Sequence, residues 1–311
     1  MITTITLNAS IDKAYFLDNE ISPGSVMRVK KFRNSAGGKG INVARVISQC
    51  GEEVKATGLV GGYNGECLKD LLKKDKVCGD FISIGGETRC CINVLDYKNE
   101  STEFLEPGPY VTDAEIDEFI NKLEEITSES RVVTISGSAP NGVDATIYEK
   151  IINYLKKIDK KVILDTSGDF LKNGINAAPT MVKPNKEELE NLFGKQIEDT
   201  DDYEKCAQYL MRKGIKYVVI SLGGEGSLLY CEDGVYKATP PNVVALNTVG
   251  CGDSMVGAFA IGLDKEKSPD EMLKFASAVA TANAMSQDTG SFDKEILQEI
   301  IDNTKVEKTG E

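Results

Sequence analysis

The chain of 311 residues carries 36 Lys and Arg against 49 Asp and Glu, a formal charge of −13, and contains no histidine and no tryptophan. The missing histidine excludes Ser-His-Asp and Cys-His hydrolases, His-ligated zinc enzymes and His-bound haem, so acid–base catalysis must use a carboxylate, Lys, Tyr, Cys or the substrate. The negative charge argues against a nucleic-acid-binding or anionic-membrane surface, because both require a basic face.

The eight cysteines form no CxxC pair and are scattered through apolar stretches, which indicates reduced thiols that serve mostly as small core residues. The N-terminus lacks the pattern of a signal peptide, and no stretch approaches about 18 uninterrupted apolar residues. We therefore expect a cytoplasmic protein without a membrane segment.

In chain order, short β-rich runs alternate with longer helical patterns. The predicted strands are residues 2–8, 55–60, 131–136, 162–165, 180–183 and 217–221, followed by a hairpin of 226–230 with 235–239. The predicted helices are residues 41–49, 65–74, 113–126, 144–157, 187–193, 202–213, 253–263, 269–285 and 294–302. This alternation predicts one α/β domain over residues 1–311, with a mostly parallel central sheet covered by helices on both faces.

Two segments break the alternation, because residues 26–32 and 81–104 are strand-like without an intervening helix. They predict a small separate sheet, a lid formed by segments of roughly 9–34 and 81–110. An antiparallel extension of the main sheet is the alternative. The tail, residues 306–311, is expected to be frayed.

The segment NTVGCGDSMVG, residues 247–257, is the strongest local signal. Gly250 and Gly252 allow a tight turn before a helix predicted to start at Asp253, and the free N–H groups of a helix N-terminus bind anions such as phosphate. Asp253 is then either an N-cap or a base that takes a proton from a hydroxyl during phosphoryl transfer.

A second glycine turn, SAGGKGIN at residues 35–42, matches neither the Walker A nor the Rossmann pattern. Gly37 and Gly38 would let a ligand approach the backbone, while Lys39 and Asn42 can bind hydroxyls or phosphate. A structural turn is the alternative.

Three further features accompany these turns. In VKPNKEE, residues 182–188, Asn185 and Glu188 have the spacing of a capping box, and the same pair could hold hydrated Mg²⁺ through its waters. SLGGEG, residues 221–226, is a glycine turn at the carboxyl end of a strand, where α/β folds bind ligands. Arg89, in GETR, is either a solvated lid residue or a phosphate-binding fork.

Together and in this order, GGKGIN, KPNKEE, SLGGEG and TVGCGDS resemble the ribokinase/PfkB carbohydrate kinases over essentially the whole chain. TLNASID, GETR, ISGSAP and NTVGCGDSMVG most resemble the hexose-phosphate branch, 1-phosphofructokinase and tagatose-6-phosphate kinase. The resemblance implies a ribokinase-like αβα sandwich with a β lid, and ATP- and Mg²⁺-dependent phosphoryl transfer to a phosphorylated ketohexose. Fructose 1-phosphate is the first candidate and tagatose 6-phosphate the alternative, while a catalytically idle sugar-phosphate sensor is the alternative of another class.

The resemblance also implies roles for individual residues. Asp253 would be the base, with an anion hole of three amides: Gly250, Cys251 and Gly252. The sugar phosphate would contact Asp12, Gly37, Gly38, Lys39, Asn42 and Arg89. The nucleotide would contact Lys183, Asn185, Glu188, Ser221, Gly223, Gly226 and Asn283, with Mg²⁺ held through water by Asn185 and Glu188.

The sequence departs from the family pattern at two positions. Asn247 stands where the common DTxGAGD motif has Asp, which leaves the need for a monovalent cation open. Cys251 replaces Ala or Ser and would be oxidation-sensitive if the helix N-terminus lowered its pKa. The expected partners are ATP and a sugar phosphate, and both a monomer and a homodimer remain open.

Overall fold

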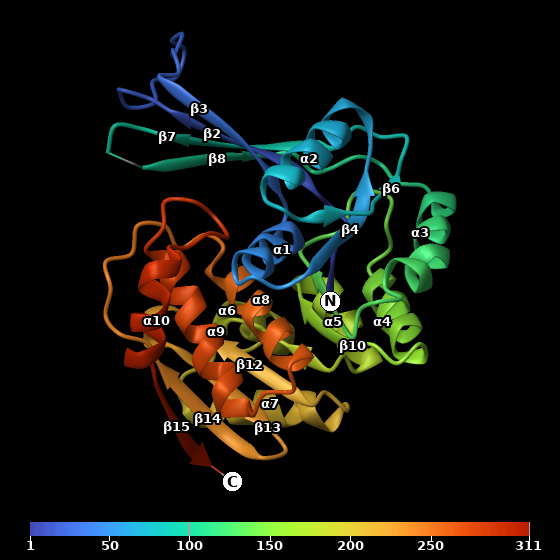
Figure 1. Ribbon diagram of the computed structural model, residues 1–311, viewed down its shortest axis with the longest axis vertical. Helices are drawn as coiled ribbons and strands as arrows, with labels where there is room; N and C mark the ends of the chain where they lie inside the picture. The colour runs from blue at the N-terminus through green and yellow to red at the C-terminus, as the bar shows by residue number, and fades with distance from the viewer. Residues whose placement is uncertain (99, 311) are drawn as a thin grey trace.

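The computed structural model describes residues 1–98 and 100–310, so Asn99 in the predicted lid and Glu311 in the predicted tail lie outside the described residues. The central sheet has the parallel strand order β12-β11-β10-β9-β1-β4 (Figure 1). These strands are β1 (Ile2–Thr6), β4 (Val54–Val60), β9 (Val132–Ser136), β10 (Lys161–Asp165), β11 (Met181–Val182) and β12 (Tyr217–Ser221).

The edges of the central sheet differ. Beyond β12 lie three antiparallel strands: β13 (Ser227–Cys231), β14 (Gly234–Thr239) and β15 (Lys305–Gly310). At the other edge, two short strands pair with β4: β5 (Cys78–Gly79) and β6 (Ile82–Ser83). The sheet is therefore mostly parallel, as predicted.

Helices cover both faces of the sheet because the buried strands expose apolar side chains alternately to either side. One core packs against α1 (Lys39–Gln49), α2 (Gly62–Lys74), α8 (Cys251–Asp264), α9 (Pro269–Ala284) and α10 (Lys294–Asn303). The other core packs against α3 (Asp113–Ile126), α4 (Ile147–Lys157), α5 (Gly168–Gly174), α6 (Lys186–Phe193) and α7 (Thr200–Arg212). Neighbouring Val132 and Val133 of β9 belong to different cores.

A separate four-stranded sheet, the lid, lies at the top of Figure 1. Its order is β3 (Lys31–Gly37), β2 (Ser10–Phe16), β7 (Arg89–Leu95) and β8 (Ser101–Leu105). The expected separate sheet is thus confirmed, and an extension of the main sheet is not what forms. Residues 82–83, which the sequence assigns to the lid, instead form β6 on the edge of the central sheet.

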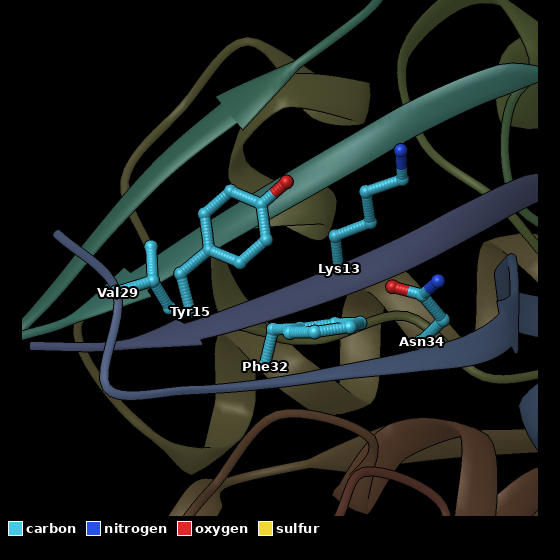
Figure 2. A pocket seen from close by; sticks show the side chains of 5 residues that line it. All are labelled: Lys13, Tyr15, Val29, Phe32 and Asn34. Atoms are coloured by element: carbon cyan, nitrogen blue, oxygen red, sulfur yellow. The ribbon is translucent and has the colours of Figure 1, made fainter.

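The two faces of the lid carry different side chains. Figure 2 shows Lys13 and Tyr15 of β2 projecting with Phe32 and Asn34 of β3 around a shallow hollow on one face. Because side chains alternate along a strand, Asp12 lies on the opposite face. The hollow is therefore separate from the glycine turns considered above.

Three sequence expectations need correction. The tail is not frayed, because residues 305–310 pair with β14 as β15. Helix α8 starts at Cys251, two residues before the predicted start, with Gly250 as its N-cap. All eight cysteines are free, but only Cys90, Cys206 and Cys231 are buried, so most are not core residues. Within the described part of the chain, no helix is long and apolar enough to cross a membrane.

Candidate active site

The expected site residues converge at the carboxyl ends of the parallel strands, where α/β folds place ligand sites. Asp165 ends β10, Lys183 directly follows β11 and Ser221 ends β12. Helices α1 and α8 begin at the same edge, with Lys39 as the first residue of α1 and Asp253 in the first turn of α8.

The turn that begins α8 requires glycine at position 250. Gly250 has a φ of +85°, and an added Cβ would lie 2.8 Å from the backbone nitrogen of Gly290. Behind the turn, Asn283 donates to the carbonyl of Val249 at 3.1 Å and to Sγ of Cys251 at 3.3 Å. The turn is therefore fixed from behind. Within it, the backbone N–H of Cys251 donates to the carbonyl of Thr248 at 3.3 Å, so one of the three amides expected to bind an anion already has a partner.

Asp253 is a buried carboxyl group, 6 % exposed, that accepts a hydrogen bond from Nδ2 of Asn42 at 2.8 Å. Burial raises the pKa of Asp253 to about 6, against the opposing effects of Lys39, Asn42 and Lys183, while the charge of Asp165 raises it further. At pH 7 to 8 the group is ionised and close to the range in which a general base is effective.

Asp165 pairs with two lysines beside Asp253. Its Oδ1 lies 3.1 Å from Nζ of Lys183 and its Oδ2 lies 3.6 Å from Nζ of Lys39. Burial alone would raise the pKa of Asp165, but the two ammonium groups outweigh it and hold the pKa below its ordinary value. The same carboxylate raises the pKa of Lys39, so this lysine stays charged.

On the lid side, Asp12 faces the glycine turn that precedes α1. Asp12 accepts a hydrogen bond from Oγ of Ser10 at 2.7 Å, and burial raises its pKa against the effects of Ser10 and nearby arginines. A Cβ at Gly37 would overlap the Asp12 carboxylate, and Gly38 has a φ of +108°. Glycine at both positions is therefore a condition for this close approach.

Comparisons with known proteins agree with this geometry. Residues 5–296 match the profile of the pfkB family carbohydrate kinases. This chain belongs to the pfkB family. Phosphofructokinase-2 from Escherichia coli has a similar structure, with 33% identity, a TM-score of 0.92, and coverage of 97% of this chain and 98% of the other. A possible 1-phosphofructokinase from Thermotoga maritima matches with 28% identity, a TM-score of 0.89 and 99% coverage of both chains.

Membership of the pfkB family makes the protein an ATP-dependent sugar kinase with the ribokinase-like fold expected from the sequence. On the side where the nucleotide is expected, Asn185 and Glu188 form the predicted capping box of α6. The backbone N–H of Glu188 donates to Oδ1 of Asn185 at 2.8 Å, and the N–H of Asn185 donates to Oε2 of Glu188 at 2.9 Å. The charge of Glu188 also acts on Lys39, so this pair faces the same edge and fits a metal held through water.

The remaining expected nucleotide residues divide into open and structural positions. Ser221 pairs with Asn185 in an isolated parallel β-bridge between their backbones. Gly223 has a φ of +60°, and no atom lies within 4 Å of an added Cβ. A Cβ at Gly226 would overlap the carbonyl oxygen of Ala238, so this glycine serves the fold. Asn283 is fully buried and supports the α8 turn, and its contact with the nucleotide stays a prediction.

Arg89 lies at the junction of the lid and the body. Nη1 donates to the carbonyl of Glu106 at 2.9 Å and Nη2 to the carbonyl of Asn8 at 3.1 Å, while Nε is buried without a hydrogen-bond partner among the described residues. A guanidinium has five N–H donors, so these two bonds leave Nη hydrogens for an anion. The geometry thus assigns Arg89 a structural contact in addition to the expected phosphate contact.

Two residues change the picture drawn from the sequence. Asp165 was missed, although an aspartate that ends a buried parallel strand is a signal that could have identified it. For Cys251, burial raises the pKa of the thiol, which outweighs the effect expected of the helix N-terminus. The condition set for an oxidation-sensitive cysteine, a lowered pKa, is therefore not met.

Proposed function

We propose that this kinase transfers the γ-phosphoryl group of ATP to a hydroxyl of a phosphorylated ketohexose, with fructose 1-phosphate as the substrate and fructose 1,6-bisphosphate as the product. One observation carries the proposal. A buried carboxyl group, Asp253, lies beside the amide turn of α8 and within the field of Lys39 and Lys183. This arrangement serves proton removal and the stabilisation of phosphoryl charge at one place.

In the proposed mechanism, the ionised Asp253 accepts the hydroxyl proton as the sugar oxygen attacks the γ-phosphorus in line, and the bond from that phosphorus to the bridging oxygen of ADP breaks. The amides of Gly250 and Gly252, with the two lysines, stabilise the charge on the transferred group, and the amide of Cys251 joins them when it exchanges its bond to Thr248 for the phosphoryl oxygen. Asp165 holds the two ammonium groups in place through its ion pairs. Most of the rate comes from positioning and charge stabilisation, because phosphoryl transfer needs little base strength before the transition state.

The metal and the substrate are assigned to opposite sides of this centre. Bound Mg²⁺ neutralises part of the charge on the ATP phosphates, and Asn185 and Glu188 would hold it through water. Asp12 would orient the sugar hydroxyls, with Gly37, Gly38 and Asn42 forming the floor. Arg89 would contact the phosphate already on the sugar.

The identity of the sugar is the open part of the proposal. TVGCGDSMVG resembles the 1-phosphofructokinases, which favours fructose 1-phosphate, while GETRCCI and FLEPGP resemble the tagatose-6-phosphate kinases. Fructose 6-phosphate is a further candidate, because phosphofructokinase-2 from Escherichia coli, a structural neighbour with 31% identity and a TM-score of 0.87, forms a complex with it.

Steady-state ADP release tests the proposal. The assay compares fructose 1-phosphate, tagatose 6-phosphate, fructose 6-phosphate and ribose, with and without Mg²⁺ and with K⁺ or Na⁺. We expect the highest kcat/KM with fructose 1-phosphate and strict dependence on Mg²⁺. A preference for another sugar phosphate would correct the substrate, whereas sugar-phosphate binding without ADP release would favour the idle sensor.

We propose that the enzyme acts in the cytoplasm and on small molecules. Its oligomeric state is left to light scattering, which distinguishes a monomer from a homodimer with and without ATP. A relative, phosphofructokinase-2 from Escherichia coli, has a tetrameric inhibited form, so a tetramer is a further outcome of this measurement.

A further inference from the structure

Arg45 is a buried arginine that is not among the residues expected to contact the sugar phosphate or the nucleotide. It lies in the middle of α1 and is 8 % exposed. Nε donates to Oδ2 of Asp75 at 2.9 Å, Nη1 to Oδ1 of Asn42 at 3.0 Å and to the carbonyl of Thr289 at 3.2 Å, and Nη2 to the carbonyl of Ala36 at 2.6 Å. A buried charge is costly even when paired, which calls for a reason beyond packing.

The contact with Asn42 determines how that side chain faces the reaction centre. Asn42 accepts from Arg45 through Oδ1 and donates to Asp253 through Nδ2 at 2.8 Å. If the amide were rotated by half a turn, its NH₂ group would face the guanidinium and its oxygen would face the carboxylate. Both contacts would then be repulsive, so Arg45 selects the amide orientation that donates to Asp253.

The other contacts of Arg45 connect this amide to the surrounding elements. Ala36 lies at the end of lid strand β3, directly before the glycine turn, and Thr289 lies in the loop after α9 that packs against Gly250. Asp75 is the C-cap of α2. The charge of Arg45 also lowers the pKa of Asp12 against the effect of burial. One side chain thus connects α1 with the end of β3, the C-cap of α2 and the loop after α9.

We propose that Arg45 is a positioning residue for phosphoryl transfer, which fixes the Asn42 amide so that it donates to Asp253 and ties the base to the root of the lid. The proposal rests on the function proposed above and adds a residue outside the site that the sequence identified. Without Arg45, the Asn42 amide is free to rotate, and the carboxylate loses its donor.

The groups that face Asp253 make the consequence measurable. Lys39 and Asn42 on α1 and Lys183 after β11 favour the ionised form, while Asp165 at the end of β10 disfavours it. Burial and the charge of Asp165 raise the pKa of Asp253, and the hydrogen bond from Asn42 lowers it. Without that hydrogen bond, the carboxyl group of Asp253 should titrate at a higher pH. The chain has no histidine to obscure this titration.

The experiment compares Arg45→Met, which keeps the stem, with Arg45→Lys, which keeps the charge but lacks the fork. The Asp253 midpoint is read by NMR of protein labelled with ¹³C in the aspartate carboxyl groups, with the signal assigned from Asp253→Asn. We expect both variants to raise the midpoint by about one pH unit. In steady-state assays, kcat at pH 7 should fall by about tenfold to a hundredfold while the KM for ATP changes little.

A double-mutant cycle and a surface control complete the test. Asn42→Ala should give the same shift, and adding it to Arg45→Met should give no further shift, because both remove one hydrogen bond. The control, Arg131→Met, removes an exposed arginine that pairs with Asp264 at the other end of α8, and should leave the midpoint unchanged.

Three outcomes would overturn the proposal: an unchanged midpoint in Arg45→Met with only a lower Tm, a wild-type midpoint in Arg45→Lys, or additive shifts in the double variant. Because the NMR titration requires no turnover, it is independent of the substrate assay. A failure of the proposed function would appear as absent ADP release in the wild-type protein, with or without a shift of the midpoint.

Discussion

The ionised carboxylate of Asp253 destabilises the folded protein relative to the unfolded chain. Its pKa is about 6 in the fold against 3.8 when exposed. Between these two values the folded protein binds a proton that the unfolded chain has lost, so the free energy of unfolding falls as the pH rises from about 4 to 6. Above pH 7 the full effect is present, on the order of 3 kcal/mol.

Asp253→Asn should therefore separate activity from stability. The amide has nearly the same shape without the charge, so we expect a higher free energy of unfolding at pH 8, by about 1–3 kcal/mol. Turnover should fall by roughly three orders of magnitude because no base remains. Urea denaturation and ADP release measure the two effects.

The pH dependence provides the control for this variant. The stability gain should shrink as the pH falls toward 5, because the wild-type carboxyl group becomes protonated in the fold. An equal gain at both pH values would contradict the assignment of the shift to Asp253, and near-normal turnover would contradict its role as the base.

For the helices and strands, the sequence predicts features formed by neighbouring residues better than contacts between residues that are far apart in the chain. The glycine turns and the capping box of Asn185 were recognisable because their residues are neighbours in the chain. Asn42 and Asp253 are 211 positions apart, so the hydrogen bond between them, and the role of Arg45 behind it, depend on how the helices pack. The start of α8 was misplaced because Asp253 resembles an N-cap, whereas Gly250 occupies that position.

Strand β15 illustrates the same limit at the edge of the sheet. Its residues are mostly polar and exposed, so the sequence offers no apolar alternation to mark a strand. It forms because β14 presents an unpaired edge, and an antiparallel partner satisfies those backbone groups. Tertiary context, which no local pattern contains, decides the structure here.

The α8 turn leads to a prediction that a matched glycine can test. Gly250→Ala should lose about 1–2 kcal/mol from the positive φ alone, and more because the methyl group meets Gly290. Since the same turn carries the amides proposed to bind the transferred phosphoryl group, kcat should fall by tenfold or more. Circular dichroism melting and steady-state kinetics give the two values.

Gly51→Ala is the control for this substitution. Gly51 has a φ of +86°, almost the same as Gly250, but no atom lies within 4 Å of an added Cβ. It should lose stability by the conformational term and keep its kcat. If both variants lost stability and activity equally, the turn would have no special part in catalysis.

At the scale of the whole molecule, two arginines connect the lid to the body in addition to the glycine turn before α1. Arg89 holds the carbonyls of Asn8 and Glu106 at the root of the lid. Farther out, Arg33 of β3 forms an ion pair with Asp288, in the loop after α9. The bond from Arg89 to Asn8 is partly buried and the bond to Glu106 is exposed, whereas Arg33 and Asp288 are both about half exposed. The ion pair of Arg33 with Asp288 can therefore break without disturbing the fold.

Removing the outer contact should therefore change substrate binding more than stability. We expect Arg33→Ala to raise the KM for the sugar phosphate several-fold, because the lid that carries Asp12 is then less often closed over the site. The free energy of unfolding should change by less than about 1 kcal/mol, as for other exposed ion pairs. Lys30→Ala is the matched control, because Lys30 pairs with Asp18 within the lid region at 2.8 Å and does not reach the body. Equal KM values for the two variants would show that the ion pair to the body has no influence on closure of the lid. If the KM values differ, the difference should disappear in 0.5 M salt, because the Debye length is then below about 5 Å. Its disappearance would identify an electrostatic origin.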